Sequence, residues 1–355
     1  MIRSAQSLFF VGRYASAEQP GIRSFLFDET TGELTVSGSF TGINNPSFLV
    51  VHPTGRWLYA VSETGQDSHG ALGEVWAFQF EREPFTIQPI NHQSSLGDWP
   101  CHLQLDATGH WLLATNYGTG NAGIYPLQAD GSLGEMTDFV QHHGTGPNAA
   151  RQEGPHAHSS IFTPDNRFAI IADLGIDQLI IYQLDTSTGK LLLYSSVNTR
   201  PGAGPRHLAF HPNGKWMYAA NELDSTVTLY DYDAANGTLL ERQNLPTIPF
   251  DSPENIVADI HVSASGQRVY VSNRGHNSIA VYDVGGDGRL IVVSIPTCGG
   301  NWPRNFALAP GGQFLLVANQ YSNEICVLPM LEGMEALGAP VARATVAGAS
   351  CIQFV

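Results

Sequence analysis

Lysine is nearly absent from this 355-residue sequence, which contains only Lys190 and Lys215. Charged residues of all kinds make up 14% of the chain, well below the share of about 25% in typical soluble domains. The 17 basic residues are outnumbered by 32 acidic ones, so the formal net charge is −15. Because a surface this acidic repels a phosphate backbone, we do not expect nucleic acid as a partner.

Cysteine pairs and long apolar runs are also lacking. The four cysteines show no CxxC motif and no zinc-like spacing; they are Cys101, Cys298, Cys326 and Cys351. Scattered thiols of this kind favour reduced core positions in a cytoplasmic protein. No stretch approaches the roughly 18 apolar residues of a membrane span, and the N-terminus shows no secretory signal. We therefore expect a cytoplasmic protein that does not contact a membrane.

Convincing helical periodicity is missing as well, whereas turn-forming residues are abundant. The 37 glycines and 21 prolines are spread over the whole chain. Hydrophobic residues make up 43%, which supports a sizeable core and excludes a disordered chain. Length alone suggests two domains at about 150 residues each. The even spread of turn residues argues instead for one repeated unit.

One phrase recurs six times: an apolar strand, a tight turn, a second apolar strand and then a polar residue. Tight hairpins need the Asn, Asp and Gly residues that the turns HPTG, DATG, TPDN, HPNG and SASG supply. The copies lie about 45–55 residues apart, the length of one four-stranded propeller blade. They span residues Pro46–Glu63, Pro100–Tyr117, His156–Leu174, Pro205–Glu222, Ala258–Arg274 and Pro303–Gln320.

The two ends of the chain supply the seventh unit. Ser350–Val355 is similar to the first strand of a copy, and Ser7–Tyr14 is similar to the second. Pairing these ends would remove the exposed edges of an open sheet. We therefore predict an all-β, seven-bladed β-propeller of four-stranded antiparallel blades, a single domain over residues 1–355. The C-terminal strand joins the N-terminal blade and closes the ring. Six blades with unrelated ends remain the alternative.

This topology places two rings of residues at one mouth of the central channel, because inner strands start where second strands end. The first ring, at the starts of the inner strands, contains Cys101/His102, His158, Arg206/His207 and Arg304/Asn305. The second ring, at the ends of the second strands, contains Glu63, Asn116/Tyr117, Asp173, Asn221/Glu222, Asn273/Arg274, Asn319/Gln320 and Gly12/Arg13.

Arginine is concentrated at this mouth. With two lysines among 17 basic residues, the chain has 15 arginines, and the rings hold Arg13, Arg206, Arg274 and Arg304. Guanidinium groups bind carboxylate and phosphate through paired hydrogen bonds, which predicts a site for a small anion. His158, His207 and Glu222 add groups suited to acid–base catalysis.

Other repeated residues favour structural roles. The ring asparagines 116, 221, 273 and 319 either tie strand ends to turns or face the channel, and the sequence leaves both open. His52 and His211 precede prolines in hairpin turns on the opposite face. Trp57, Trp111 and Trp216 hold equivalent positions at the second strands and are expected to pack blade against blade.

Three segments carry a family resemblance: Gly202–Leu223, Ala258–Arg274 and Gly144–Ser159. They resemble the seven-bladed propeller lactonases, the family of bacterial 6-phosphogluconolactonase and fungal carboxymuconate-lactonising enzyme. The resemblance implies catalysis by the set His158, Arg206, Glu222 and Arg274. The residues assigned to substrate binding are His156, His207, Arg304, Asn319, Gln320 and Arg151.

The resemblance further implies hydrolysis of a sugar lactone, 6-phosphogluconolactone, in the pentose phosphate pathway, with no cofactor and no metal. Arg206 and Arg274 would hold the carbonyl oxygen. Either Glu222 or His158 would take a proton from water. No GxSxG nucleophile elbow is present, so no covalent intermediate is expected.

Several alternatives remain open at this stage. The same groups could close a lactone ring, as in a carboxymuconate-type cycloisomerase, or open an unphosphorylated lactone. Glu63 and the ring asparagines could hold Ca²⁺ in the channel, although nearby arginines would repel it. A protein-binding propeller is the non-enzymatic alternative, because fold does not dictate function. The sequence leaves the oligomeric state and the choice between His156 and His158 undecided.

Overall fold

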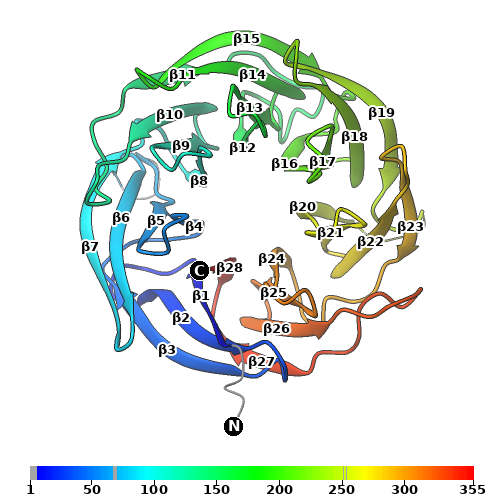
Figure 1. The fold of residues 1–355 in the computed structure, drawn as a ribbon. Coiled ribbons are helices and arrows are strands. Elements are labelled where there is room, and N and C mark those ends of the chain that lie inside the picture. Colours follow the sequence, from blue (N-terminus) through cyan, green and yellow to red (C-terminus); the bar gives the residue numbers. More distant parts are fainter. Residues whose placement is uncertain (1–5, 67–69, 251, 253) are drawn as a thin grey trace.

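Seven sheets surround a central axis in the computed structural model, which describes residues 6–66, 70–250, 252 and 254–355 (Figure 1). These residues form 28 strands, four to a sheet, and neighbouring strands within each sheet are antiparallel. The predicted seven-bladed all-β propeller is confirmed.

Six blades are each built from four strands that follow one another along the chain. The first two are β4 (Leu49–Val51), β5 (Trp57–Ser62), β6 (Glu74–Arg82), β7 (Phe85–Ser94), and β8 (Pro100–Leu105), β9 (Trp111–Asn116), β10 (Asn121–Pro126), β11 (Asp138–Gln141). The next two are β12 (Ala157–Phe162), β13 (Phe168–Asp173), β14 (Gln178–Asp185), β15 (Lys190–Asn198), and β16 (Pro205–Phe210), β17 (Trp216–Asn221), β18 (Thr226–Asp233), β19 (Thr238–Pro246). The last two are β20 (Ile256–Val262), β21 (Arg268–Arg274), β22 (Ser278–Val284), β23 (Leu290–Ser294), and β24 (Pro303–Leu308), β25 (Phe314–Asn319), β26 (Glu324–Pro329), β27 (Ala342–Thr345).

The remaining blade combines both ends of the chain and closes the ring. Its order from the axis outward is β28 (Ala349–Phe354), β1 (Gln6–Arg13), β2 (Pro20–Asp28) and β3 (Leu34–Thr41). Phe9 lies opposite Phe354 and Gly12 opposite Cys351 in the β1–β28 ladder. The predicted closure by the C-terminal strand is therefore confirmed, and the alternative of six blades with unrelated ends is excluded.

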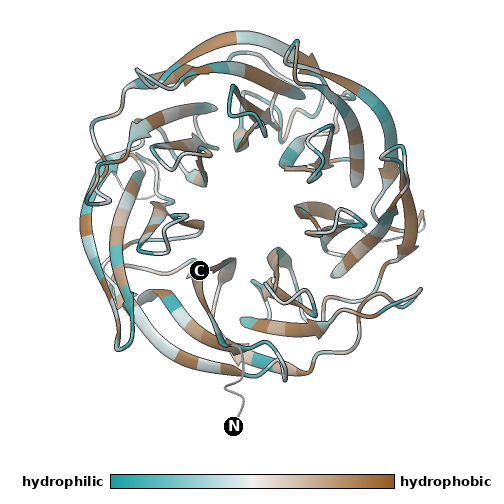
Figure 2. Ribbon diagram, viewed as in Figure 1, coloured by the Kyte–Doolittle hydropathy of each residue, from teal (hydrophilic) through white to brown (hydrophobic). Residues whose placement is uncertain are grey.

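Burial changes systematically from the inner to the outer strands. Every residue of β5, β9, β13 and β25 is buried. These second strands are covered on both faces by neighbouring blades, so they are apolar except for the polar residues at their C-terminal ends. The outer strand β15 has exposed residues in a partly alternating pattern, and Figure 2 shows the outermost ribbons banded with hydrophilic and hydrophobic residues. The core therefore lies between blades.

The repeated tryptophans make a repeated contact between neighbouring blades. Each indole ring packs directly against a turn glycine of the next blade. A Cβ atom at that position would collide with the indole, so only glycine fits there. The pairs are Trp57 with Gly131, Trp111 with Gly189 and Trp216 with Gly288. All three glycines have positive φ values. The blade-packing role expected for these tryptophans is confirmed.

His52 links two hairpin turns on the face opposite the two rings. Its Nε2 lies 3.0 Å from the carbonyl oxygen of Gly109, in the next blade, and its side chain is buried. We predict that His52→Ala lowers the free energy of unfolding by about 1–3 kcal/mol, since a buried hydrogen-bond partner is lost. Urea unfolding measures this loss, and activity should be unchanged.

The matched control for His52 is His110→Ala. His110 is exposed and follows Gly109 on the hairpin turn that His52 contacts. It should alter the free energy of unfolding by less than about 0.5 kcal/mol. Equal stability of the two variants would contradict the structural role of His52.

Candidate active site

A β-bulge at the start of the inner strands sets the direction of the first-ring side chains. In the ladders of β8, β12, β16 and β24, the register shifts by one residue at the same place. The unpaired residues are Cys101, His158, Arg206 and Arg304. A bulge bends its strand and redirects a side chain, so these four side chains converge at one mouth of the channel.

The second ring divides into two sets of positions. The asparagines 116, 221 and 319 lie opposite the first residue of an inner strand, Asn273 lies opposite the second, and all four are buried. The Nδ2 of Asn116 donates to the carbonyl oxygen of Ser95 at 3.0 Å, and that of Asn273 to Thr247 at 3.0 Å. These asparagines therefore secure strand ends, which decides the question that the sequence left open.

The residues that follow three of these asparagines, Tyr117, Glu222 and Arg274, line a cavity of about 290 Å³. This volume is near the lower end of the range for ligand-binding pockets and suits a small metabolite. The lining residues are Tyr14, Glu63, Trp99, Cys101, Tyr117, Arg151, His158, Glu222, Ile256, Arg274 and Arg304.

Glu222 is the centre of an ion cluster beside this cavity. Its Oε1 lies 2.5 Å from Nη2 of Arg151, and its Oε2 lies 2.6 Å from Nη2 of Arg274. Nε of Arg206 approaches Oε2 to 2.9 Å, an ion-pair contact outside hydrogen-bond geometry. Burial alone would raise the pKa of Glu222, but the guanidinium groups of Arg274, Arg206 and Arg151 lower it well below its usual value.

Arg304 is placed differently from the arginines that hold Glu222. Within the described part of the chain, no hydrogen bond or ion pair engages its guanidinium group, which stands 5.1 Å over the ring of Tyr14. The side chain is only partly buried and lines the cavity. Arg304 is therefore a guanidinium group available to a ligand.

Depth distinguishes the arginines further. Arg304 and Arg206 line a smaller inner cavity of about 10 Å³, room for about one water molecule. Arg151 and Arg274 line the 290 Å³ cavity and also an outer cavity of about 720 Å³. Arg206 is pinned by Glu222 and by the carbonyl oxygen of Ala258. The order from the channel outward is thus Arg206, then Arg304, then Arg274 and Arg151.

Of the two candidate histidines, His158 lines the cavity. Burial and the nearby Arg206 lower the pKa of His158 well below its usual value, so the ring is neutral near pH 7. The ring of His156 instead stacks on Tyr117, with centroids 4.4 Å apart, and its Nδ1 lies 2.8 Å from the Tyr117 carbonyl oxygen. His156 thus supports a lining residue from behind.

His207 belongs to the inner cavity. Its Nδ1 lies 2.7 Å from Oδ1 of Asp259, and burial together with Arg206 lowers the pKa of His207 to about 4. Burial raises the pKa of Cys101 to about 12, so this thiol is protonated near pH 7. A neutral thiol is a weak nucleophile, which agrees with the expected absence of a covalent intermediate.

Arg13, Asn319 and Gln320 are among the ring residues that do not line the 290 Å³ cavity. Arg13 donates from Nη1 to the carbonyl oxygen of Pro20 at 3.1 Å and from Nη2 to Gln19. Asn319 is fully buried, and its Oδ1 accepts from Sγ of Cys298 at 3.2 Å. Gln320 follows Asn319 and lines neither the 290 Å³ cavity nor the inner one. Asn319 and Gln320, which the sequence assigned to substrate binding, therefore do not line this cavity.

Sequence reasoning missed Tyr14, Trp99 and Ile256 as lining residues. The repeat contained a signal for Tyr14. Arg13 lies opposite Ala349, the first residue of its inner strand, just as Asn221 lies opposite Pro205 in its own blade. The residue after Arg13 is therefore the equivalent of Glu222. Trp99 and Ile256 lie outside the two rings, so the repeat gives no signal for them.

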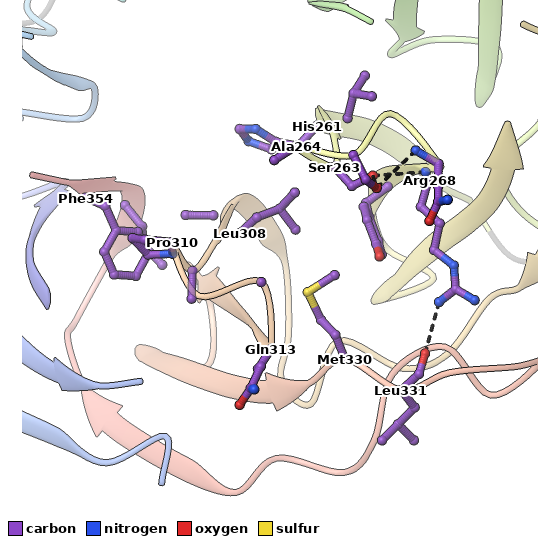
Figure 3. Close-up of a pocket in the computed structure, with 18 of the residues that line it drawn as sticks. His261, Ser263, Ala264, Arg268, Leu308, Pro310, Gln313, Met330, Leu331 and Phe354 are labelled. Atoms are coloured by element: carbon purple, nitrogen blue, oxygen red, sulfur yellow. Dashed lines mark hydrogen bonds between the residues drawn. The ribbon is translucent and has the colours of Figure 1, made fainter. Parts of the chain in front are cut away.

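A larger groove of about 1050 Å³ lies at the hairpin turns of β20–β21 and β24–β25, the end of the channel opposite the rings (Figure 3). Its cation Arg268 is held by the carbonyl oxygen of Leu331 at 3.0 Å and by Asp283. Catalytic sites gather convergent polar groups with perturbed pKa values. The smaller cavity at the ring mouth is therefore the candidate active site.

Two findings bear on other classes of function. Among the described residues, no three His, Cys, Asp or Glu side chains are grouped so that they could hold a metal ion. In the same part of the chain, no helix has the length and apolar character needed to cross a membrane.

Comparison with known proteins agrees with this geometry. The model of the family "Lactonase, 7-bladed beta-propeller" matches residues 8–354. A 6-phosphogluconolactonase of Bacillus subtilis is 36% identical over 89% of both chains, and one of Formosa agariphila is 33% identical over 90% of this chain and 91% of the relative. The structure of a periplasmic gluconolactonase of Pseudomonas aeruginosa superposes with a TM-score of 0.92 at 29% identity, covering 99% of both chains. The chain belongs to the seven-bladed β-propeller lactonase family.

Proposed function

We propose that the protein hydrolyses a sugar lactone that carries an anionic group, with 6-phosphogluconolactone as the substrate. The observation that carries this proposal is the available guanidinium group of Arg304 beside the neutral ring of His158 in one small cavity. Donors aimed at the place where negative charge develops contribute strongly to acyl-transfer catalysis. Arg304 fits that role for the lactone carbonyl oxygen.

The layering of the arginines orients the substrate. Arg304 lines both the main and the inner cavity, whereas Arg151 and Arg274 line the main and the outer one. A phosphate at the end of the sugar distant from the carbonyl would lie toward Arg151 and Arg274. We propose this arrangement in place of the sequence-based hypothesis that Arg206 and Arg274 hold the carbonyl oxygen. Arg206 is already engaged by Glu222 and by the carbonyl oxygen of Ala258.

The charge of the cavity supports an anionic substrate. Four guanidinium groups and two carboxyl groups converge at this mouth: Arg151, Arg206, Arg274, Arg304, Glu63 and Glu222. The local balance is positive although the whole chain carries a formal charge of −15. Such local charge raises the concentration of an anionic substrate at the site.

Lactones with and without a 6-phosphate test the proposal. The relatives include both 6-phosphogluconolactonases and a gluconolactonase, so the panel needs 6-phosphogluconolactone and gluconolactone. We expect kcat/KM to be at least about tenfold higher for the phosphorylated substrate, since one charge-assisted contact contributes about 1.4 kcal/mol or more.

A pH-stat measures the acid released, and the spontaneous opening of each lactone is subtracted as the control. Equal kcat/KM values for the two lactones would remove the phosphate from the proposal. Failure to open any lactone would overturn the proposed activity.

A further inference from the structure

Two carboxyl groups line the active-site cavity, and their surroundings are opposite in character. Glu222 is held by the guanidinium groups of Arg151, Arg206 and Arg274. Glu63 is held by hydroxyl groups: Oη of Tyr14 donates to its two oxygens at 3.0 and 2.8 Å, and Oγ of Ser47 also donates. Pairs of titratable groups driven apart by their environments identify the acid–base roles in a site.

Glu222 is unsuited to accept a proton. Both of its oxygens are occupied by guanidinium groups at 2.5 and 2.6 Å, and its side chain is 3% exposed. Although burial acts in the other direction, Arg274, Arg206 and Arg151 lower its pKa well below the usual value. A carboxylate stabilised in this way is a weak base, so Glu222 organises the arginines instead.

Glu63 has the properties that Glu222 lacks. Burial raises the pKa of Glu63 above its usual value, partly offset by Arg304 and by the hydrogen bonds from Ser47 and Tyr14. The side chain is only partly buried and lines the cavity. A carboxyl group with a raised pKa can both take up and return a proton near neutral pH.

The backbone fixes Glu63 next to the oxyanion donor. Its amide N donates to the carbonyl oxygen of Asn45 at 3.0 Å, and Nδ2 of Asn45 donates to the Glu63 carbonyl oxygen at 3.3 Å. Tyr14, which donates to the Glu63 carboxylate, lies under the Arg304 guanidinium group at 5.1 Å. Glu63 and Arg304 therefore flank the same part of the cavity.

We propose that Glu63 is the general base that takes the proton from the attacking water and then returns it to the leaving ring oxygen. This assignment rests on the proposed lactone hydrolysis. As the water oxygen bonds to the carbonyl carbon, one water proton moves to Glu63 and negative charge develops on the carbonyl oxygen beside Arg304. When the ring C–O bond breaks, the protonated Glu63 gives that proton to the departing oxygen. The product carboxylic acid then loses its proton to solvent.

A purely structural Glu63 would serve only as an acceptor for Tyr14 and Ser47. The variant Glu63→Gln keeps an acceptor oxygen for these hydroxyl groups but cannot take up a proton. We expect kcat for the preferred lactone to fall by about 10²–10⁴, the usual contribution of general acid–base catalysis, while KM changes less than about threefold. Glu81→Gln is the matched control, because Glu81 is exposed on β6, and it should leave kcat unchanged.

The pH profile separates a base from a structural acceptor. A base must be deprotonated, so kcat rises with pH through the Glu63 pKa. Tyr14→Phe and Ser47→Ala each remove a donor that lowers this pKa, and each should move the acidic limb of the profile to higher pH. The other titratable and charged groups facing Glu63 are Arg304, Arg206 and Cys101. The pKa of Cys101, raised to about 12 by burial, lies far above the limb.

His158 also titrates in acid, because burial and Arg206 lower its pKa, so a shift of the limb in Tyr14→Phe and Ser47→Ala distinguishes Glu63 from His158. An unmoved limb in both variants, or full activity of Glu63→Gln, would overturn the role of Glu63 while leaving lactone hydrolysis intact. Recovery of activity in Glu63→Ala on addition of formate would support it even if Glu63→Gln folded poorly. A wild-type protein inactive on every lactone would overturn the activity and this role together.

Discussion

The variant Glu222→Gln is expected to lose about 3–5 kcal/mol of unfolding free energy, the cost of removing one partner from a buried ion pair. Its carboxylate lies within 2.9 Å of three guanidinium groups, and Arg206 and Arg274 are themselves buried. Without the carboxylate, like charges face one another away from water. Activity should fall as well, because these arginines shape the cavity. Urea unfolding followed by tryptophan fluorescence measures the stability loss.

A surface carboxylate supplies the control for Glu222→Gln. Glu241 pairs with Arg200 at 2.8 Å, and the two side chains are 33% and 56% exposed, so Glu241→Gln should cost less than about 1 kcal/mol. In the Glu222→Gln background, the further change Arg151→Gln should cost less stability than it does in the wild type, by about 0.5–3 kcal/mol, because it relieves repulsion. Strict additivity of the two changes would contradict the ion cluster.

Arg304→Ala is expected to lower kcat by about 10²–10³ for phosphorylated and unphosphorylated lactones alike, the usual effect of removing one oxyanion donor. In the described residues no hydrogen bond or ion pair engages this guanidinium group, and its contact with the Tyr14 ring contributes about 0.5–1 kcal/mol, so the free energy of unfolding should fall by no more than about 1 kcal/mol. Steady-state kinetics with both lactones measures the effect on kcat and KM separately.

Arg151→Gln is the comparison for Arg304→Ala, because Arg151 lies at the outer side of the same cavity. It should raise KM for the phosphorylated lactone by about tenfold, as expected for the loss of one charge-assisted contact, and leave the unphosphorylated one nearly unaffected. If Arg304→Ala instead changed only KM for the phosphorylated lactone, Arg304 would be the phosphate ligand and the orientation would be reversed.

The propeller itself could be predicted from the sequence because its information is local. Six blades repeat two apolar strands and a turn with a left-handed residue, such as Gly55, Gly109 and Gly214, or Asn166 in the copy that lacks glycine there. Strand, turn and strand are neighbours along the chain, so the pattern needs no distant contact. The likeness of Ser350–Val355 and Ser7–Tyr14 to these strands was enough to predict the closure.

The rings at the channel mouth could be predicted only to within one residue. The pairs Cys101/His102, Arg206/His207 and Arg304/Asn305 each contain the side chain that the bulge directs toward the mouth, but alternation along a strand does not reveal a bulge. For the same reason the sequence predicted Arg13 at the mouth instead of Tyr14. The guanidinium group of Arg13 donates to Pro20 and Gln19. One shifted residue exchanges a lining side chain for a buried one.

The sequence by itself determined the seven blades, the closure and the group of residues at one mouth of the channel. The tertiary structure decided how these residues pair with one another and which of them line the cavity. Arg151 meets Glu222 across 71 positions of the chain, and Tyr14 meets Glu63 across 49. These contacts give two glutamates of identical chemistry opposite pKa shifts and leave Arg304 available to a ligand. A side chain's charge state depends on its neighbours in space, and several of those neighbours, such as Arg274 for Glu222 and Tyr14 for Glu63, come from another blade.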